Sequence, residues 1–114
     1  MLYPSDLDFL SCFGLELTKL VNNGNIYQCV QADDINHHKV VITFSPAQEF
    51  VQVEIFLEDN CIFKAYNENI GNMSFFDEKN GKGINVYMQG HDYNPIIKVF
   101  LEPRIKCLVT LMDA

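Results

Sequence analysis

The sequence predicts a mainly β domain of the α+β type, with an antiparallel meander of about six to eight strands and one short N-terminal helix. We expect the curved sheet to form a sandwich or a partial barrel. Three observations lead to this prediction. Short apolar runs recur at nearly even spacing from Leu15 to Met112, turn signals separate them, and apolar and polar residues alternate within them. Consecutive runs with short connections are typical of β-hairpins.

The turn signals have a conformational basis. Asn23-Gly24 and Asn80-Gly81 each separate two apolar runs. Both pairs tolerate the positive φ that a type I′ hairpin turn requires at its two central residues. Glu58-Asp59-Asn60 and Glu102-Pro103-Arg104 join further runs, and the proline in the second is unable to donate a ladder hydrogen bond.

Alternation predicts which side of each strand is buried. In the run from Phe50 to Leu57, the odd-numbered residues are all aliphatic, whereas the even-numbered residues mix polar and aromatic types. The same alternation recurs in Ile96–Leu101 and Ile105–Met112. The mixed face is too rich in aromatic residues for a fully solvated surface. We therefore expect the sheet to curl, or a helix or a partner to cover part of that face.

The N-terminal segment has helical spacing. Ser5 is a suitable N-cap, and Gly14 is a suitable stop. Between them, Leu7, Leu10 and Phe13 follow one another at intervals of three, and Phe9 adds to the same side. We therefore predict a helix over Pro4–Phe13 whose apolar residues pack on the sheet.

Two stretches interrupt the rhythm of strands. Ala32–Lys39 is a polar segment, and Asn67–Ser74 is rich in Asn and Gly. Both are predicted to be loops. No linker or internal repeat divides the chain, so we expect residues 1–114 to form a single domain.

Composition favours a cytoplasmic protein. The N-terminus has no signal-peptide pattern, and the apolar runs are far shorter than the roughly 20 residues of a membrane span. The four cysteines, Cys12, Cys29, Cys61 and Cys107, are scattered among apolar residues. We expect reduced and mostly buried thiols, with two disulfides as the alternative for an exported protein.

The net charge of −7 restricts the classes of partner. Nucleic acids and anionic membranes are disfavoured, because binding them requires clustered Lys and Arg. A basic protein partner is favoured, whereas the simpler alternative is that the charge only maintains solubility.

No arrangement of residues predicts catalysis or a bound cofactor. Asp33-Asp34 with His37-His38 has the residue types of a metal site, but adjacent histidines in an extended segment point to opposite sides. We interpret this segment as a solvated loop that holds no metal. His91-Asp92 reads as a loop rather than a base with its orienting carboxylate, and the chain is predicted not to be an enzyme.

The remaining candidate is a protein-binding surface. Acidic residues gather at turns and strand ends, and aromatic residues lie near them in the sequence. Alternate turns of a meander emerge at one end of the sheet, so these residues are predicted to form an acidic rim with aromatic anchors. The predicted binding residues are Asp33, Asp34, Glu58, Asp59, Tyr66, Phe76, Asp77, Glu78, Asp92 and Tyr93.

In size, charge and the Asn/Gly-punctuated strands that end in Ile105–Met112, the chain resembles the immunity proteins of bacterial toxin–immunity systems, including those of contact-dependent inhibition. The resemblance implies direct binding of a cognate toxin domain, often a basic nuclease, by electrostatic capture and aromatic burial. Two alternatives remain open. One is a β-barrel that binds a small ligand or lipid, and the other is an adaptor subunit that buries the mixed face in a homo-oligomer.

Overall fold

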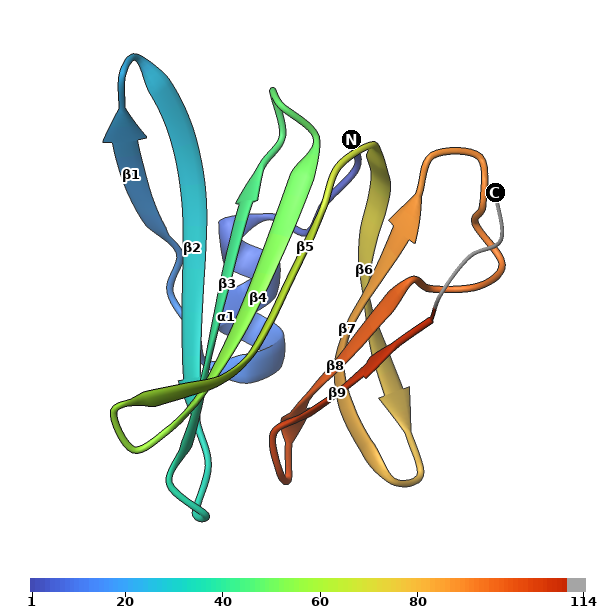
Figure 1. The fold of residues 1–114 in the computed structure, drawn as a ribbon. Helices are drawn as coiled ribbons and strands as arrows, with labels where there is room; N and C mark the ends of the chain where they lie inside the picture. The colour runs from blue at the N-terminus through green and yellow to red at the C-terminus, as the bar shows by residue number, and fades with distance from the viewer. Residues whose placement is uncertain (111–114) are drawn as a thin grey trace.

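A computed structural model describes residues 1–110, which form two packed antiparallel sheets and one helix (Figure 1). One sheet has the order β1-β2-β3-β4-β5 and the other the order β6-β7-β8-β9, so within each sheet every strand pairs with its sequence neighbours, and the chain changes sheet between β5 and β6. The sheets do not close into a barrel, and the predicted antiparallel meander is confirmed. The elements are α1 (Asp6–Phe13), β1 (Thr18–Asn22), β2 (Asn25–Asp33), β3 (His38–Ser45), β4 (Phe50–Leu57), β5 (Asn60–Asn67), β6 (Ile70–Glu78), β7 (Gly81–Met88), β8 (Ile97–Glu102) and β9 (Lys106–Val109).

The core lies between the two sheets and follows the predicted alternation. Val51, Val53 and Ile55 of β4 face the core, as do Ile97 and Val99 of β8. Each of these side chains is at most 6% exposed. Residues of the opposite parity lie on the outer faces of the sheets, which are the faces turned away from the core.

The two Asn-Gly signals behave differently. Asn23 and Gly24 have φ values of 52° and 80°, as the predicted type I′ turn requires. The prediction for Asn80-Gly81 is wrong, because Glu78 pairs with Gly81 and the turn residues are therefore 79 and 80. Gly81 is needed for space instead, since a Cβ there would lie 2.5 Å from the carbonyl oxygen of Glu102.

Helix α1 begins at Asp6, and the predicted Ser5 cap is confirmed. The Ser5 hydroxyl accepts a hydrogen bond from the backbone N–H of Asp8 at 3.2 Å, and Gly14 ends the helix with a φ of 67°. The predicted buried face is only partly correct, because Phe9 is buried and Phe13 packs against the core, whereas Leu7 and Leu10 are 69% and 48% exposed. The ring of Phe9 packs against both sheets, since it lies beside Phe44 of β3 and meets Phe75 of β6 edge to face.

Both predicted loops are shorter than expected. Strand β2 extends to Asp33 and β3 begins at His38, while β6 begins at Ile70 within the segment predicted to be irregular. The N-terminal segment explains the second difference. Leu2 donates its N–H to the Gly71 carbonyl and accepts a hydrogen bond from the N–H of Met73. This long-range pairing satisfies the backbone of β6 where side-chain alternation is weak.

Two carboxylates join the sheets at opposite ends of the sandwich. Asp34, between β2 and β3, accepts a hydrogen bond of 2.9 Å from the backbone N–H of Ile105, before β9. Glu49, between β3 and β4, accepts a 2.6 Å hydrogen bond from the Gln89 side chain and lies 3.4 Å from the N-terminal amine. Figure 1 shows these two turns at opposite ends of the β1–β5 sheet.

The four thiols are free, but the prediction that most are buried is only half correct. Cys29 is buried and Cys107 is half-buried, whereas Cys12 and Cys61 are exposed. Cys12 lies on the solvent side of α1, and Cys61 lies near the start of the edge strand β5. Burial raises the pKa of the Cys107 thiol to about 11.

Candidate protein-binding surface

The acidic turns divide between the two ends of the molecule. The turns after β2, β4, β6 and β8 lie at the same end, as the meander predicts (Figure 1). Asp33, Glu58, Asp59, Asp77 and Glu78 are exposed at or beside these turns. Asp92 and Tyr93 lie in the loop between β7 and β8, at the opposite end, so one rim does not contain all the predicted residues.

The negative charge is concentrated in the first part of the chain. Residues 1–69, which include α1 and the β1–β5 sheet, contain ten acidic and three basic side chains. Residues 70–114 contain five of each. The net charge of −7 therefore belongs to the first region, and Asp77 and Glu78 lie in the region where charges balance.

The outer face of the β6–β9 sheet covers its aromatic rings with its own lysines. Phe76 and Phe100 meet edge to face at 4.9 Å and are 8% and 2% exposed. The Lys98 ammonium lies 4.4 Å from the Phe76 ring centroid, and the Lys106 ammonium lies 4.3 Å from that of Phe100. Lys98 also forms a 2.6 Å ion pair with Glu78. Phe76, a predicted anchor, is thus buried within its own sheet.

The outer face of the β1–β5 sheet carries an aromatic cluster, which we define as Tyr27, Phe50 and Tyr66. The ring of Phe50 lies 5.6 Å from that of Tyr27 and 5.3 Å from that of Tyr66. Strand β3 runs between Tyr27 and Phe50, and Ser45 pairs with Phe50 there. The small serine side chain leaves room for the two rings to meet above the strand. Tyr66 remains 48% exposed at the edge of the cluster.

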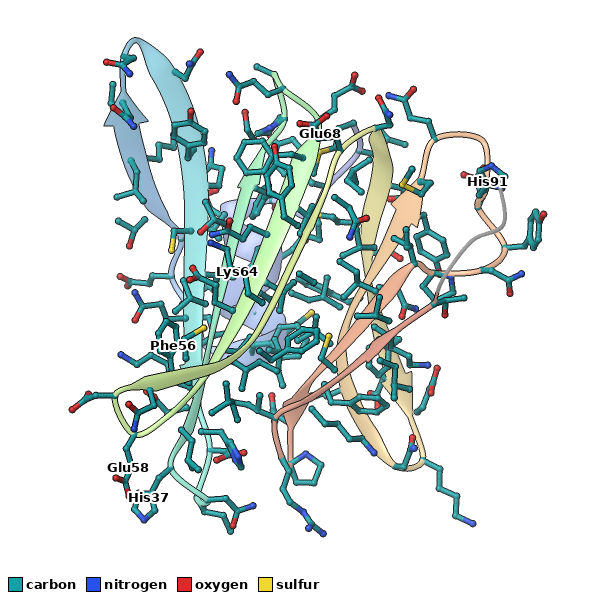
Figure 2. The ribbon with its side chains drawn as sticks, in the orientation of Figure 1. His37, Phe56, Glu58, Lys64, Glu68 and His91 are labelled. Atoms are coloured by element: carbon teal, nitrogen blue, oxygen red, sulfur yellow. The ribbon has the colours of Figure 1, made fainter. Side chains whose placement is uncertain are left out.

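Carboxylates lie beside the aromatic cluster. The Tyr66 hydroxyl donates a 3.1 Å hydrogen bond to Glu68, and the Gln52 side chain donates one of the same length to Glu54. The pKa of Tyr66 is raised, mainly because the hydroxyl is partly removed from water. Its hydrogen bond to Glu68 and the charge of that carboxylate raise the pKa further. Figure 2 shows Glu68 near one end of β5 and Lys64 further along the same strand. The cluster is therefore amphipathic and bordered by negative charge.

Asp34 serves a structural purpose, which corrects the interpretation of its segment as a solvated loop. Its side chain is only 1% exposed, and it accepts backbone hydrogen bonds from Asn36, His38 and Ile105. Burial raises the pKa of Asp34, but the three N–H groups and the adjacent His38 lower it more, so the net result is a pKa below the usual range. A partner protein does not reach a carboxylate enclosed in this way.

The histidines do not gather. His38 Nδ1 lies 3.5 Å from the Asp34 carboxylate. His37 and His91 are exposed at opposite ends of the molecule (Figure 2). In the part of the chain that the structure describes, His, Cys, Asp and Glu side chains nowhere form a group of three or more that could hold a metal ion.

The aromatic residues of the mixed faces do not line an interior cavity. Phe50, Phe56 and Tyr66 lie on the outer face of the β1–β5 sheet, and Phe100 lies on that of the β6–β9 sheet. A surface hollow of about 510 Å³ is lined mainly by polar and basic residues of the turns. The alternative of a closed ligand-binding barrel is therefore wrong, since the sheets are not closed and the core between them is packed.

The sequence predicts Tyr66 as a binding residue and offers Tyr27 as an aromatic anchor, but it does not connect them with Phe50, Glu54 and Glu68. From the sequence, Phe50 is predicted only to lie on a mixed strand face, and Glu54 and Glu68 are not among the predicted binding residues. The alternation in Phe50–Leu57 indicated that Phe50 and Glu54 share a face. It could not indicate that Tyr27 and Tyr66 lie beside Phe50, because this depends on strand order and register.

Neither a family model nor a curated protein matches this chain. Among solved structures, it is similar to a chain of the contact-dependent growth inhibition toxin–immunity protein complex from Klebsiella pneumoniae 342. The TM-score is 0.79 at 18% identity, and the match covers 96% of this chain and 95% of that one. The two chains share a fold. The predicted resemblance to the toxin–immunity class is confirmed at this level.

Helix α1 has eight residues. Within residues 1–110, no helix combines the length and the apolar character needed to cross a membrane.

Proposed function

We propose that this chain is an immunity protein, which neutralises a cognate toxin in the bacterial cytoplasm by binding it directly. One observation carries the proposal, namely the fold shared along nearly the whole chain with a component of a toxin–immunity complex. The net charge of −7 supports a basic partner, because opposite charges accelerate association and orient the encounter. The inhibitor acts by covering the toxin rather than by catalysis.

The test requires a candidate toxin domain, taken from the protein that the gene immediately upstream of this one encodes. That domain is expressed in a bacterial host with and without this chain, and growth is measured. We expect growth arrest by the domain alone and full rescue on co-expression. The purified pair, with the toxin inactivated in its active site, should elute as one complex during size-exclusion chromatography.

Two results would contradict the proposal. The first is growth arrest caused by this chain alone, which would make it the toxic component. The second is a toxic upstream domain that this chain neither binds nor neutralises. A vector without insert and an unrelated acidic protein of similar size are the matched controls for non-specific charge effects.

A further inference from the structure

We propose that the toxin docks on the outer face of the β1–β5 sheet, over the aromatic cluster of Tyr27, Phe50 and Tyr66. The occupant is a surface of the toxin domain that presents Lys or Arg side chains to these rings and to Glu54 and Glu68. This inference rests on the proposed function and assigns the binding surface within it.

The first argument is charge complementarity. All of the net negative charge lies in residues 1–69, which form α1 and the β1–β5 sheet. Residues 70–114 have equal numbers of acidic and basic side chains, and Lys98 and Lys106 lie on the outer face of their sheet. Around the aromatic cluster itself, Glu54 and Glu68 lie beside the rings and Lys64 pairs with Glu54, so the nearest charges are net negative and attract a basic protein at physiological ionic strength.

The second argument is that lysine side chains cover the aromatic rings on one outer face but not on the other. In residues 1–110, lysine ammonium groups lie over the rings of Phe13, Phe76 and Phe100. The aromatic cluster has no such covering in this part of the chain. A lysine or arginine from a partner would make the contact with Tyr66 and Phe50 that Lys98 and Lys106 make internally with Phe76 and Phe100.

The third argument is preorganisation. The three rings come from β2, β4 and β5, and the centroid of the Phe50 ring already lies 5.6 Å from that of Tyr27 and 5.3 Å from that of Tyr66. Tyr66 is further positioned by its hydrogen bond to Glu68. Ordering these side chains on binding therefore costs little conformational entropy. Leu20, which is 46% exposed and pairs with Tyr27, extends the apolar surface toward β1.

The experiment measures the affinity and association rate of the inactivated toxin domain for variants of this chain. Tyr66→Ala removes the exposed ring and should raise Kd about 30-fold or more, as expected for a central aromatic anchor. Tyr66→Phe keeps the ring and should change Kd by less than about fivefold. Glu68→Lys should slow association about tenfold at low salt.

Two further variants test the sign of the electrostatic effect. Lys64 lies on the same outer face, two residues before Tyr66. Lys64→Glu makes this face more acidic and should accelerate association by roughly two- to fivefold. Asp77→Lys makes the same type of charge change as Glu68→Lys, but at the end of β6 in the other sheet, and should alter Kd by less than about threefold. Circular dichroism verifies that each variant is folded.

The outcomes separate this inference from the proposed function. If the toxin binds and Asp77→Lys weakens binding while Tyr66→Ala and Glu68→Lys do not, the proposed function stands and the acidic turns form the interface. If Tyr66→Ala instead dissociates a dimer of this chain and leaves toxin affinity unchanged, the aromatic cluster is a self-association surface. Either result overturns the assignment of the surface. Absence of any toxin binding contradicts the proposed function itself.

Discussion

The outer faces of the two sheets use similar residues in different ways. On the β6–β9 sheet, Phe76 and Phe100 are nearly buried beneath Lys98 and Lys106. On the β1–β5 sheet, the ring of Phe50 lies between those of Tyr27 and Tyr66, and Tyr66 stays 48% exposed. The first arrangement removes aromatic surface from water within the chain. The second leaves part of the aromatic surface in contact with water, where it is available to a partner.

A glycine explains why the phenylalanines of the β6–β9 sheet are covered so well. Gly83 of β7 pairs with both Phe76 and Phe100. A Cβ at this position would collide with the backbone carbonyl of Val99. The absence of a side chain lets the two rings meet above β7, and the lysines of β8 and β9 then lie over them. The comparison supports the proposal that one face contributes to stability and the other to binding.

Phe100→Ala gives the largest expected effect. Removing this buried ring should reduce the free energy of unfolding by about 3–5 kcal/mol, because it deletes apolar contacts and leaves a cavity beneath Lys98 and Lys106. Urea unfolding followed by circular dichroism measures the change. The matched variant Tyr66→Ala should cause a markedly smaller loss. Similar losses for both variants would remove the distinction between the two faces.

Asp34→Ala should have the next largest effect, since Asp34 joins the sheets on which both faces are built. The substitution leaves the backbone N–H groups of Asn36, His38 and Ile105 without their acceptor. We expect the free energy of unfolding to fall by about 2–4 kcal/mol, measured by urea unfolding at neutral pH. Asp33→Ala is the matched control, and an equal loss there would contradict a special role for Asp34.

The lowered pKa of Asp34 makes its contribution depend on pH. The folded protein holds the ionised form more strongly than the unfolded chain, whose aspartate pKa is about 3.9. The stabilisation is therefore complete above that value and is lost as pH falls through the lower folded-state pKa. The stability difference between the wild-type protein and Asp34→Asn should shrink as pH falls below about 4. A constant difference between pH 7 and pH 3 would contradict this.

Lys98→Met tests whether the internal lysines stabilise the β6–β9 face. Methionine keeps much of the alkyl stem but removes the ion pair with Glu78 and the cation above Phe76. The expected loss in free energy of unfolding is about 0.5–1.5 kcal/mol, and it should decrease in high salt. No loss at low salt would show that Phe76 and Phe100 pack equally well without the charge.

The two cysteines on edge strands should differ in how fast they are alkylated. We expect this alkylation to change the stability of the protein only slightly. Cys61 on β5 is exposed, whereas Cys107 on β9 is half-buried with a pKa of about 11. At pH 8, iodoacetamide should modify Cys61 well before Cys107, since the thiolate is the reactive form. Mass spectrometry of time points measures this in a Cys12→Ser background. Earlier modification of Cys107 would indicate that β9 opens readily.

The sequence by itself determined the local structure and the inner faces of the strands. The hairpin at Asn23-Gly24, the Ser5 cap and the buried residues of β4 and β8 all follow from nearest-neighbour chemistry and alternation. It also determined that the net charge of the protein is negative. These features require no knowledge of distant contacts, because each depends on a few consecutive residues.

Only the tertiary structure decided where β6 begins, which side of α1 is buried and what the carboxylates do. Leu2 pairs with the edge of β6, Phe9 packs against residues of both sheets, and Asp34 reaches Ile105 across 71 positions of the chain. Leu111 and Met112, predicted to continue the last strand, lie outside the described residues.

The candidate surface was also decided at this level. Tyr27, Phe50 and Tyr66 lie on three strands, and only strand order and register bring their rings together. The same is true of the lysines that cover Phe76 and Phe100. Alternation tells which side chains leave the core, but neighbours across strands determine whether an outward aromatic ring is covered by its own chain or remains open to a partner.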